Sequence, residues 1–357
     1  MINLMSGVSN GFTTFLYILL AIFVFGILIL VHELGHYIAA RCFKVTVKEF
    51  SIGLGPKLVS YTSKKTNIKY SLRLLPLGGY VSMVGEDEET DDPNALNKKK
   101  PWKRLIIMCA GAVTNIFLGV VLMFILVLTP NFRIGGTTVS HIEEDYVQTQ
   151  EKELLVGDRI VKVGNTRVHF YQELAYEIMN KGYEPIDLTV VRNGEEIKLE
   201  QVVFPKDEQD GVTFGNMFFS VFAMKKTFGN VVGYSFYSSF STIKMIWESL
   251  ISLITGRFGF SALSGPVGVT KTVAESAQAG ITSLLYITVF ISMNLGVFNL
   301  LPIPSLDGSR VLFVLIEMVR GKPIDPKYEG YIHFAGIILI FMLLIAVTFK
   351  DIVSLIR

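Results

Sequence analysis

Val31-His32-Glu33-Leu34-Gly35-His36 closes a long uncharged run that starts at the amino terminus. In an α-helix, residues four positions apart lie on one face, so His32 and His36 can bind one cation together. Glu33 lies on a neighbouring face, where its carboxylate can take a proton from a water that a zinc ion has made acidic. Two histidines that hydrogen-bond to other groups are the alternative. Because these polar groups are costly at the end of a membrane-length helix unless they are paired or ligated, we predict a metal site.

The composition predicts a membrane protein that also carries a soluble part. The chain has 357 residues, of which 50% are hydrophobic and 18% are charged, and its mean hydropathy is +0.47. It is too apolar for a soluble protein and too charged for a wholly embedded one. The net charge of +2 argues neither for nor against nucleic acid, and no nucleic-acid partner is predicted. Cys42 and Cys109 lie beside predicted spans and imply no disulfide framework; Cys42 is a weaker candidate ligand than an acid further along the chain.

Four apolar runs are long enough to cross a bilayer. They are 12–40, of which 12–31 is the apolar part, 105–128, 281–306 and 331–349. A cleaved signal peptide is the competing interpretation of the first run, but no basic segment precedes it. By the positive-inside rule, the basic clusters at 41–48 and 98–104 put the metal-binding end of the first helix near the cytoplasm and both termini outside.

Residues 48–83 have the pattern of a small β-sheet. Their short β-type runs are broken by Pro76 and by Gly78-Gly79, which predicts a hairpin or sheet directly after the metal helix. A free edge of such a sheet can accept an extended peptide by strand addition. A cytoplasmic domain without a catalytic part fits the pattern equally well.

Residues 131–225 form the plainly soluble segment. Strand runs at 138–142, 159–163, 187–192 and 198–204 accompany a short helix at 171–180. Gly157-Asp158-Arg159-Ile160, followed by Gly164-Asn165, resembles the signature of PDZ domains, so we expect a PDZ-like α+β domain on the outer side. Within residues 226–262, the aromatic and Ser-rich stretch 228–257 predicts an interfacial amphipathic helix, because Lys244 and Glu248 interrupt it.

Asp307 is the predicted third metal ligand. Pro302 and Pro304 must end the third span, and Asp307 is the sole acid there, on the same side of the membrane as His36. Its alternative role is to cap a helix that starts at Gly308, but two histidine ligands need a third at the same depth. Asn115 in the second span needs a polar partner and serves either helix packing or substrate. The stretch Ser264–Gly268 is predicted to be a turn.

Three motifs together resemble the site-2 protease family of intramembrane zinc metalloproteases. They are H-E-L-G-H at 32–36, S-G-P-V-G at 264–268 and N-x-x-P-x-P-x-x-D-G at 299–308. The order of spans, sheet and one PDZ-like domain resembles the bacterial regulator-of-sigma-E protease branch. The resemblance implies Zn2+ bound by His32, His36 and Asp307, with Glu33 as general base. It also implies that Asn115 and Asn299 contact substrate, although Ala112 stands where the family often has Pro.

The resemblance implies an intramembrane zinc metalloendopeptidase in the bacterial cell membrane, surrounded by lipid. Its substrates would be single-span membrane proteins already cut outside, such as anti-sigma factors or signal-peptide remnants, and the 50–83 sheet would re-enter the membrane to hold them extended. The expected fold is a polytopic α-helical membrane protein with about four transmembrane helices, a membrane-associated β-sheet and an inserted extracytoplasmic PDZ-like domain. The expected divisions are 1–130, 131–225, 226–262 and 263–357.

Two other classes of function remain open at this point. A metal transporter would need polar residues along a path across the bilayer, and the spans largely lack them. A catalytically silent PDZ adaptor would not need Glu33, because zinc binding does not require that residue.

Overall fold

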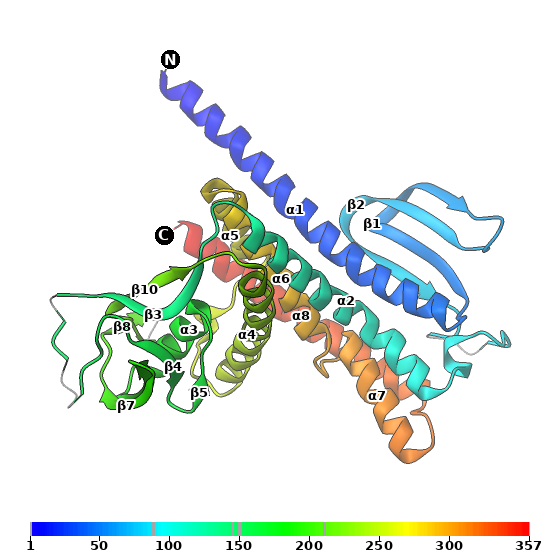
Figure 1. Cartoon of the computed structure of the whole chain (residues 1–357). Coiled ribbons are helices and arrows are strands. Elements are labelled where there is room, and N and C mark those ends of the chain that lie inside the picture. Colours follow the sequence, from blue (N-terminus) through cyan, green and yellow to red (C-terminus); the bar gives the residue numbers. More distant parts are fainter. Residues whose placement is uncertain (1, 87–89, 145, 149–151, 210–211, 357) are drawn as a thin grey trace. The chain divides into compact units, whose positions relative to one another are not determined.

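The computed structural model describes residues 2–86, 90–144, 146–148, 152–209 and 212–356 (Figure 1). The chain divides into two compact units. One unit combines Met1–Gly119 with Ser264–Arg357, and the other is Val120–Leu263.

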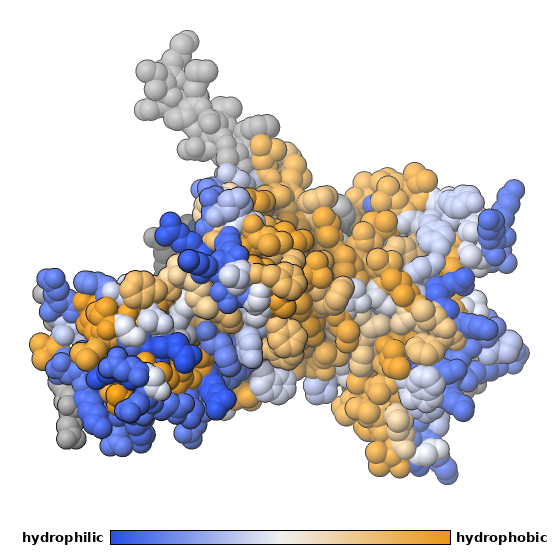
Figure 2. Space-filling model, viewed as in Figure 1, coloured by the Kyte–Doolittle hydropathy of each residue, from blue (hydrophilic) through white to orange (hydrophobic). Residues whose placement is uncertain are grey.

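The first unit contains the membrane-length helices. Its helices are α1 (Ile2–Cys42), most of α2 (Pro101–Leu128), α5 (Pro266–Ala279), α6 (Ile281–Asn299), α7 (Asp307–Arg320) and α8 (Pro326–Ile356). Among the described residues, the candidate spans are Phe15–Cys42, Pro101–Leu128, Ile281–Asn299 and Lys327–Ser354. Hydrophobic residues gather over these helices on the face shown in Figure 2. The four helices of membrane length agree with the predicted spans and are the architecture of a multi-pass membrane protein.

Small residues bring α1 and α6 close to α2 on two sides. A Cβ added at Gly35 of α1 would lie 2.6 Å from the carbonyl oxygen of Ala110. A Cβ at Gly296 of α6 would lie 2.8 Å from the carbonyl oxygen of Ala112. The Ser292 hydroxyl also donates to the Asn115 carbonyl at 2.8 Å. Membrane helices gain no hydrophobic driving force from associating, so close backbone contacts of this kind contribute to their packing.

The third predicted span is shorter than expected, and one predicted turn is wrong. Helix α6 ends at Asn299, and the chain then forms an irregular segment up to Leu306 because it contains Pro302 and Pro304. The stretch Ser264–Gly268, predicted to be a turn, instead begins helix α5, with Pro266 in its first turn. Proline is favoured at that position because its missing N–H would have had no helical partner.

A buried carboxylate from α8 holds the start of α5. Asp351 is 4% exposed, and its Oδ2 accepts the N–H of Gly265 at 2.9 Å and the N–H of Gly268 at 2.8 Å. The first N–H groups of a helix have no partner within it, and a negative charge there meets the positive end of the helix dipole. Asp351 therefore joins the end of the chain to the S-G-P-V-G motif.

Residues 47–83 form the predicted sheet, as two long strands, β1 (Val47–Thr62) and β2 (Lys69–Met83). Each of residues 49–52 faces one partner within 79–82 and another within 69–72, so the strands fold into four paired segments. Their order is 57–62, 69–73, 49–52, 79–83. Gly79, on the last segment, contacts α1: a Cβ there would lie 3.5 Å from Cγ of Glu33. The sheet therefore lies against the helix that carries the H-E-L-G-H motif.

The second unit contains a mixed α+β fold. The main sheet has the order β10 (Phe219–Met224), β3 (Ile134–Ile142), β4 (Arg159–Val163), β6 (Ile186–Arg192), β7 (Glu195–Val202), and β5 (Thr166–Arg167) pairs with β4. Strands β8 (Lys206–Gln209) and β9 (Val212–Gly215) form a separate pair. Strands β8 to β10 were not predicted, because their short runs lack a clear alternation of apolar and polar residues.

Helices α3 (Tyr171–Lys181) and α4 (Phe228–Ile254) pack together in the second unit. The Tyr176 hydroxyl donates to Glu248 at 2.7 Å, and buried Glu177 accepts hydrogen bonds from both Lys181 and Lys244. Burial raises the pKa of the Glu177 carboxyl, but the hydrogen bonds from Lys181 and Lys244 outweigh it and lower this pKa below its ordinary value. Lys244 and Glu248, whose charges argued in the sequence against a membrane span at 228–257, thus bind α4 to α3.

We predict that Asp351→Ala lowers the thermal stability of the purified protein. The variant leaves two N–H groups without a partner in a buried site, at a cost of about 1–3 kcal/mol for each group. Thermal unfolding in detergent measures the effect as a fall in Tm. Ser354→Ala, one turn further along α8, is the matched control and should leave Tm nearly unchanged. An Asp351→Ala protein as stable as the parent would contradict this role.

Candidate metal centre

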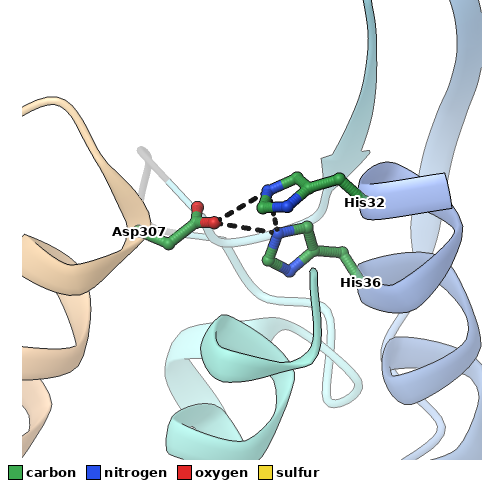
Figure 3. Close-up of side chains that lie close together, drawn as sticks. All are labelled: His32, His36 and Asp307. Carbon is green, nitrogen blue, oxygen red and sulfur yellow. Dashed lines mark hydrogen bonds and ion pairs between the residues drawn. The ribbon is translucent and has the colours of Figure 1, made fainter. Parts of the chain in front are cut away.

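Helices α1 and α7 bring together two imidazoles and one carboxylate from opposite ends of the chain (Figure 3). Nε2 of His32 lies 2.9 Å from Oδ2 of Asp307, and Nε2 of His36 lies 3.2 Å from the same oxygen. The two Nε2 atoms are 3.2 Å apart. Among the described residues these three side chains form a group that could hold a metal ion. The predicted ligands His32, His36 and Asp307 are therefore neighbours.

A backbone carbonyl fixes the orientation of the His36 ring. Nδ1 of His36 donates to the carbonyl oxygen of Ile107 on α2 at 2.8 Å. A proton on Nδ1 leaves Nε2 unprotonated and directed at Asp307, which is the form of imidazole that binds a metal. The rings of His32 and His36 meet edge to face, with centroids 4.8 Å apart, so both are constrained.

Gly111 of α2 leaves the space that the rings occupy. A Cβ at this position would lie 2.3 Å from Nε2 of His36 and 2.8 Å from Cε1 of His32. Real Cβ atoms do not approach other atoms so closely. The sequence does not indicate that Gly111 faces the histidines, because Gly111 and the two rings come together only in three dimensions.

The geometry and donor set fit zinc. Around a tetrahedral Zn2+ with bonds of about 2.0–2.1 Å, neighbouring ligand atoms lie roughly 3.3 Å apart. The three separations here, 2.9, 3.2 and 3.2 Å, are close to that value. His32 and His36 are only 8% and 7% exposed, and the Nε2 atoms of both rings lie within hydrogen-bond distance of Oδ2 of Asp307. Buried polar groups gathered in this way need a partner, and a cation supplies one.

The remaining predicted residues occupy different places. Glu33 is partly buried beside Gly79 and is not among the three clustered ligands. Asn115 lies on α2, one turn beyond Gly111; it is fully buried, and its side-chain amide has no hydrogen-bond partner among the described atoms. Asn299 is the last residue of α6 and is partly buried. Cys42 is exposed and lies outside the cluster.

A membrane-length helix that carries two of the three clustered residues and a glutamate next to them, with the third at the start of α7, is the arrangement of a membrane-embedded metallopeptidase. The profile of peptidase family M50 matches residues 20–343, and the chain belongs to this family, the site-2 proteases. The chain is thus a zinc metalloprotease, and its metal is Zn2+.

Curated relatives match the chain along almost its whole length. A Clostridium acetobutylicum protein that carries the provisional name of a zinc metalloprotease is 38% identical over 341 residues, 95% of this chain and 98% of its own. The zinc metalloprotease RasP of Oceanobacillus iheyensis is 28% identical and covers 93% of this chain and 97% of its own. The regulator of sigma-W protease RasP of Bacillus subtilis is 27% identical, with the same coverage.

We predict that Gly111→Ala removes most of the bound zinc. The added methyl group collides with both imidazole rings, so the histidines must move away from Asp307. Metal content per purified protein, measured by elemental analysis, should fall well below that of the parent. Val113→Ala, an exposed position on the same helix, is the control and should keep its zinc. Normal zinc content in Gly111→Ala would show that the rings do not depend on this space.

Proposed function

We propose that this chain is an intramembrane endopeptidase that cleaves transmembrane segments of single-span membrane proteins. We also propose that it is a member, with one PDZ-like domain, of the branch that includes the regulator-of-sigma-E protease. The observation that carries the proposal is the meeting of His32 and His36, on the membrane-length helix α1, with Asp307 at the start of α7, while Glu33 is one residue from a ligand. A soluble metalloprotease would not need its ligands there.

The residues have distinct roles in this proposal. His32, His36 and Asp307 hold the zinc, which, when bound, lowers the pKa of a water and polarises the substrate carbonyl. Glu33 is the general base: its carboxylate takes the proton of the attacking water and passes it to the leaving amide nitrogen. Asn115 and Asn299 contact the substrate, and the unpartnered amide of Asn115 supports this assignment because it has donors and an acceptor to offer.

The edge of the β1–β2 sheet holds the substrate extended. A helical substrate hides its peptide bonds in internal hydrogen bonds, so it must unwind before hydrolysis. Residues 79–83 pair with 47–52 on one side among the described residues, and Gly79 lies beside Glu33. Strand addition on the other side would bring the unwound backbone to the general base. Apolar side chains on the sheet are exposed, which suits contact with lipid; they include Ile52, Leu54, Leu58, Val59, Leu72 and Leu74.

The relatives and the charge pattern support the biological setting. The Bacillus subtilis relative is named a regulator of sigma-W protease, which supports anti-sigma factors as one candidate class of substrate; signal-peptide remnants are a second. We place the protein in the bacterial cell membrane, with the metal site towards the cytoplasm and the PDZ-like domain outside, because the basic clusters at 41–48 and 98–104 flank the metal end.

The roles of Glu33 and of the ligands can be separated by metal analysis and a cleavage assay. Glu33→Gln should keep about one zinc and lose at least about 10²-fold in hydrolysis, the usual scale of general-base catalysis. His36→Ala and Asp307→Ala should lose both metal and activity. Full activity in Asp307→Ala would overturn the ligand assignment, and hydrolysis by Glu33→Gln at the parent rate would overturn the assignment of the base.

The orientation can be tested by labelling single cysteines in intact cells. In a background without Cys42 and Cys109, a cysteine at 200 should react with an impermeant reagent added outside, and a cysteine at 90 should react only after the membrane is opened. The reverse pattern is incompatible with the proposed orientation.

The requirement for an earlier external cut can be tested with two substrates that share one transmembrane segment. One carries a folded external domain and the other a short stub. The parent enzyme should cut the stub and leave the longer form intact, because the PDZ-like domain restricts access. Equal rates would rule out a size filter and favour peptide recognition by that domain.

A further inference from the structure

The chain makes a tight turn immediately before Asp307. The Leu306 N–H donates to the Ile303 carbonyl at 3.1 Å, with Pro304 and Ser305 between them. The φ of Ser305 is +74°, a left-handed value. Proline at the second position and positive φ at the third are the features of a type II turn, whose third residue is normally glycine. A serine with this φ is disfavoured, because its Cβ crowds the backbone, so the surrounding structure must hold it there.

His333 of α8 supplies the contact that holds Ser305. The Ser305 N–H, which has no acceptor within such a turn, donates to Nδ1 of His333 at 3.1 Å. An accepting Nδ1 requires that the proton of the neutral ring lies on Nε2. Nε2 is buried, and the carboxylate of Glu329, one helical turn earlier, is 3.7 Å away. The ring also meets Phe313 of α7 edge to face, at a centroid distance of 5.8 Å. Nε2 makes no hydrogen bond among the described atoms, but a protonated Nε2 directed at the Glu329 carboxylate and the packing on Phe313 both favour the orientation that accepts from Ser305.

Gly336, which follows His333 by one helical turn on α8, packs against the same β-turn. A Cβ at Gly336 would lie 2.3 Å from Cβ of Pro304, so only glycine allows α8 this close. His333 and Gly336 are three residues apart and therefore share a helix face. Helix α8 thus contacts both central residues of the turn: Gly336 packs against Pro304, and His333 accepts a hydrogen bond from Ser305.

The turn determines where Asp307 begins. Leu306 is the N-cap of α7 and Asp307 is its first residue. The direction of the chain as it leaves the turn therefore determines the position of the Asp307 carboxylate. The segment that precedes the turn packs closely against the start of α7: a Cβ at Gly308 would lie 2.1 Å from the carbonyl oxygen of Leu301. Zinc ligands must lie within about 0.2 Å of their ideal distance, so a small rotation of this turn changes the affinity for the ion.

We propose that His333 is a positioning residue for the metal site: it holds Ser305 in its left-handed conformation and thereby directs the carboxylate of Asp307 towards His32 and His36. The proposal rests on Asp307 being a zinc ligand. It assigns to the last span a role in the metal site, although that span contributes no ligand.

The test measures zinc affinity of the full-length protein in detergent by competition with a chromogenic chelator. His333→Ala should weaken zinc binding by about tenfold, the lower end of what loss of an outer-shell partner costs. His333→Asn should keep most of the affinity, because its amide oxygen can accept the Ser305 N–H. Phe334→Ala, an exposed neighbour on α8, should bind zinc like the parent.

A second substitution separates positioning from a general loss of structure. Glycine adopts a φ of +74° without strain, so Ser305→Gly should restore zinc affinity to His333→Ala. The Tm of the zinc-free proteins, measured in parallel, should differ little between His333→Ala and Phe334→Ala. Unchanged zinc affinity in His333→Ala would overturn the proposal, as would a loss that neither His333→Asn nor Ser305→Gly repairs. Retention of zinc by Asp307→Ala instead defeats the ligand assignment, so the two failures are distinguishable.

Discussion

The close approach of α1 and α2 is the constraint on which the metal site depends. Gly35 lets the two backbones touch at Ala110, and from that contact the Ile107 carbonyl reaches Nδ1 of His36 while Gly111 leaves room for both imidazoles. Any side chain larger than hydrogen at Gly35 or Gly111 would separate the helices or displace the rings. The same contact between α1 and α2 therefore determines both the helix packing and the orientation of the ligands. It explains why these positions hold glycine, where a larger residue such as Leu or Val would not fit.

The last helix organises the carboxyl-terminal half without supplying a ligand. Asp351 holds the start of α5, which packs against α1, and His333 holds the turn that leads into α7. Both contacts place a polar side chain of α8 against backbone N–H groups; Asp351 is buried and His333 is partly buried. In an apolar environment such N–H groups need acceptors within the protein. In the proposed arrangement, the position of Asp307 depends on residues that follow it in the chain.

In the second unit, helix α4 packs against helix α3 and strand β3 of the α+β fold. Glu177 on α3 pairs with Lys244 on α4, and Tyr176 with Glu248, so strands, α3 and α4 form one compact unit. The core of this unit includes strand residues such as Val139, Ile160 and Leu188 together with Leu174 and Ile178 of α3.

The sequence alone determined the spans, the sheet and three candidate ligands, because each has a strong local signal. Length and hydropathy identify a span, alternation identifies a strand, and His32 and His36 show their common face through their spacing. Asp307 followed from the need for a third ligand at the same depth. Only the tertiary structure showed the contacts of Gly111, Ser305 and His333, since these contacts join residues that no local pattern relates. The helix after Gly265 escaped prediction for the same reason: the acid that caps it, Asp351, lies 86 positions further along the chain.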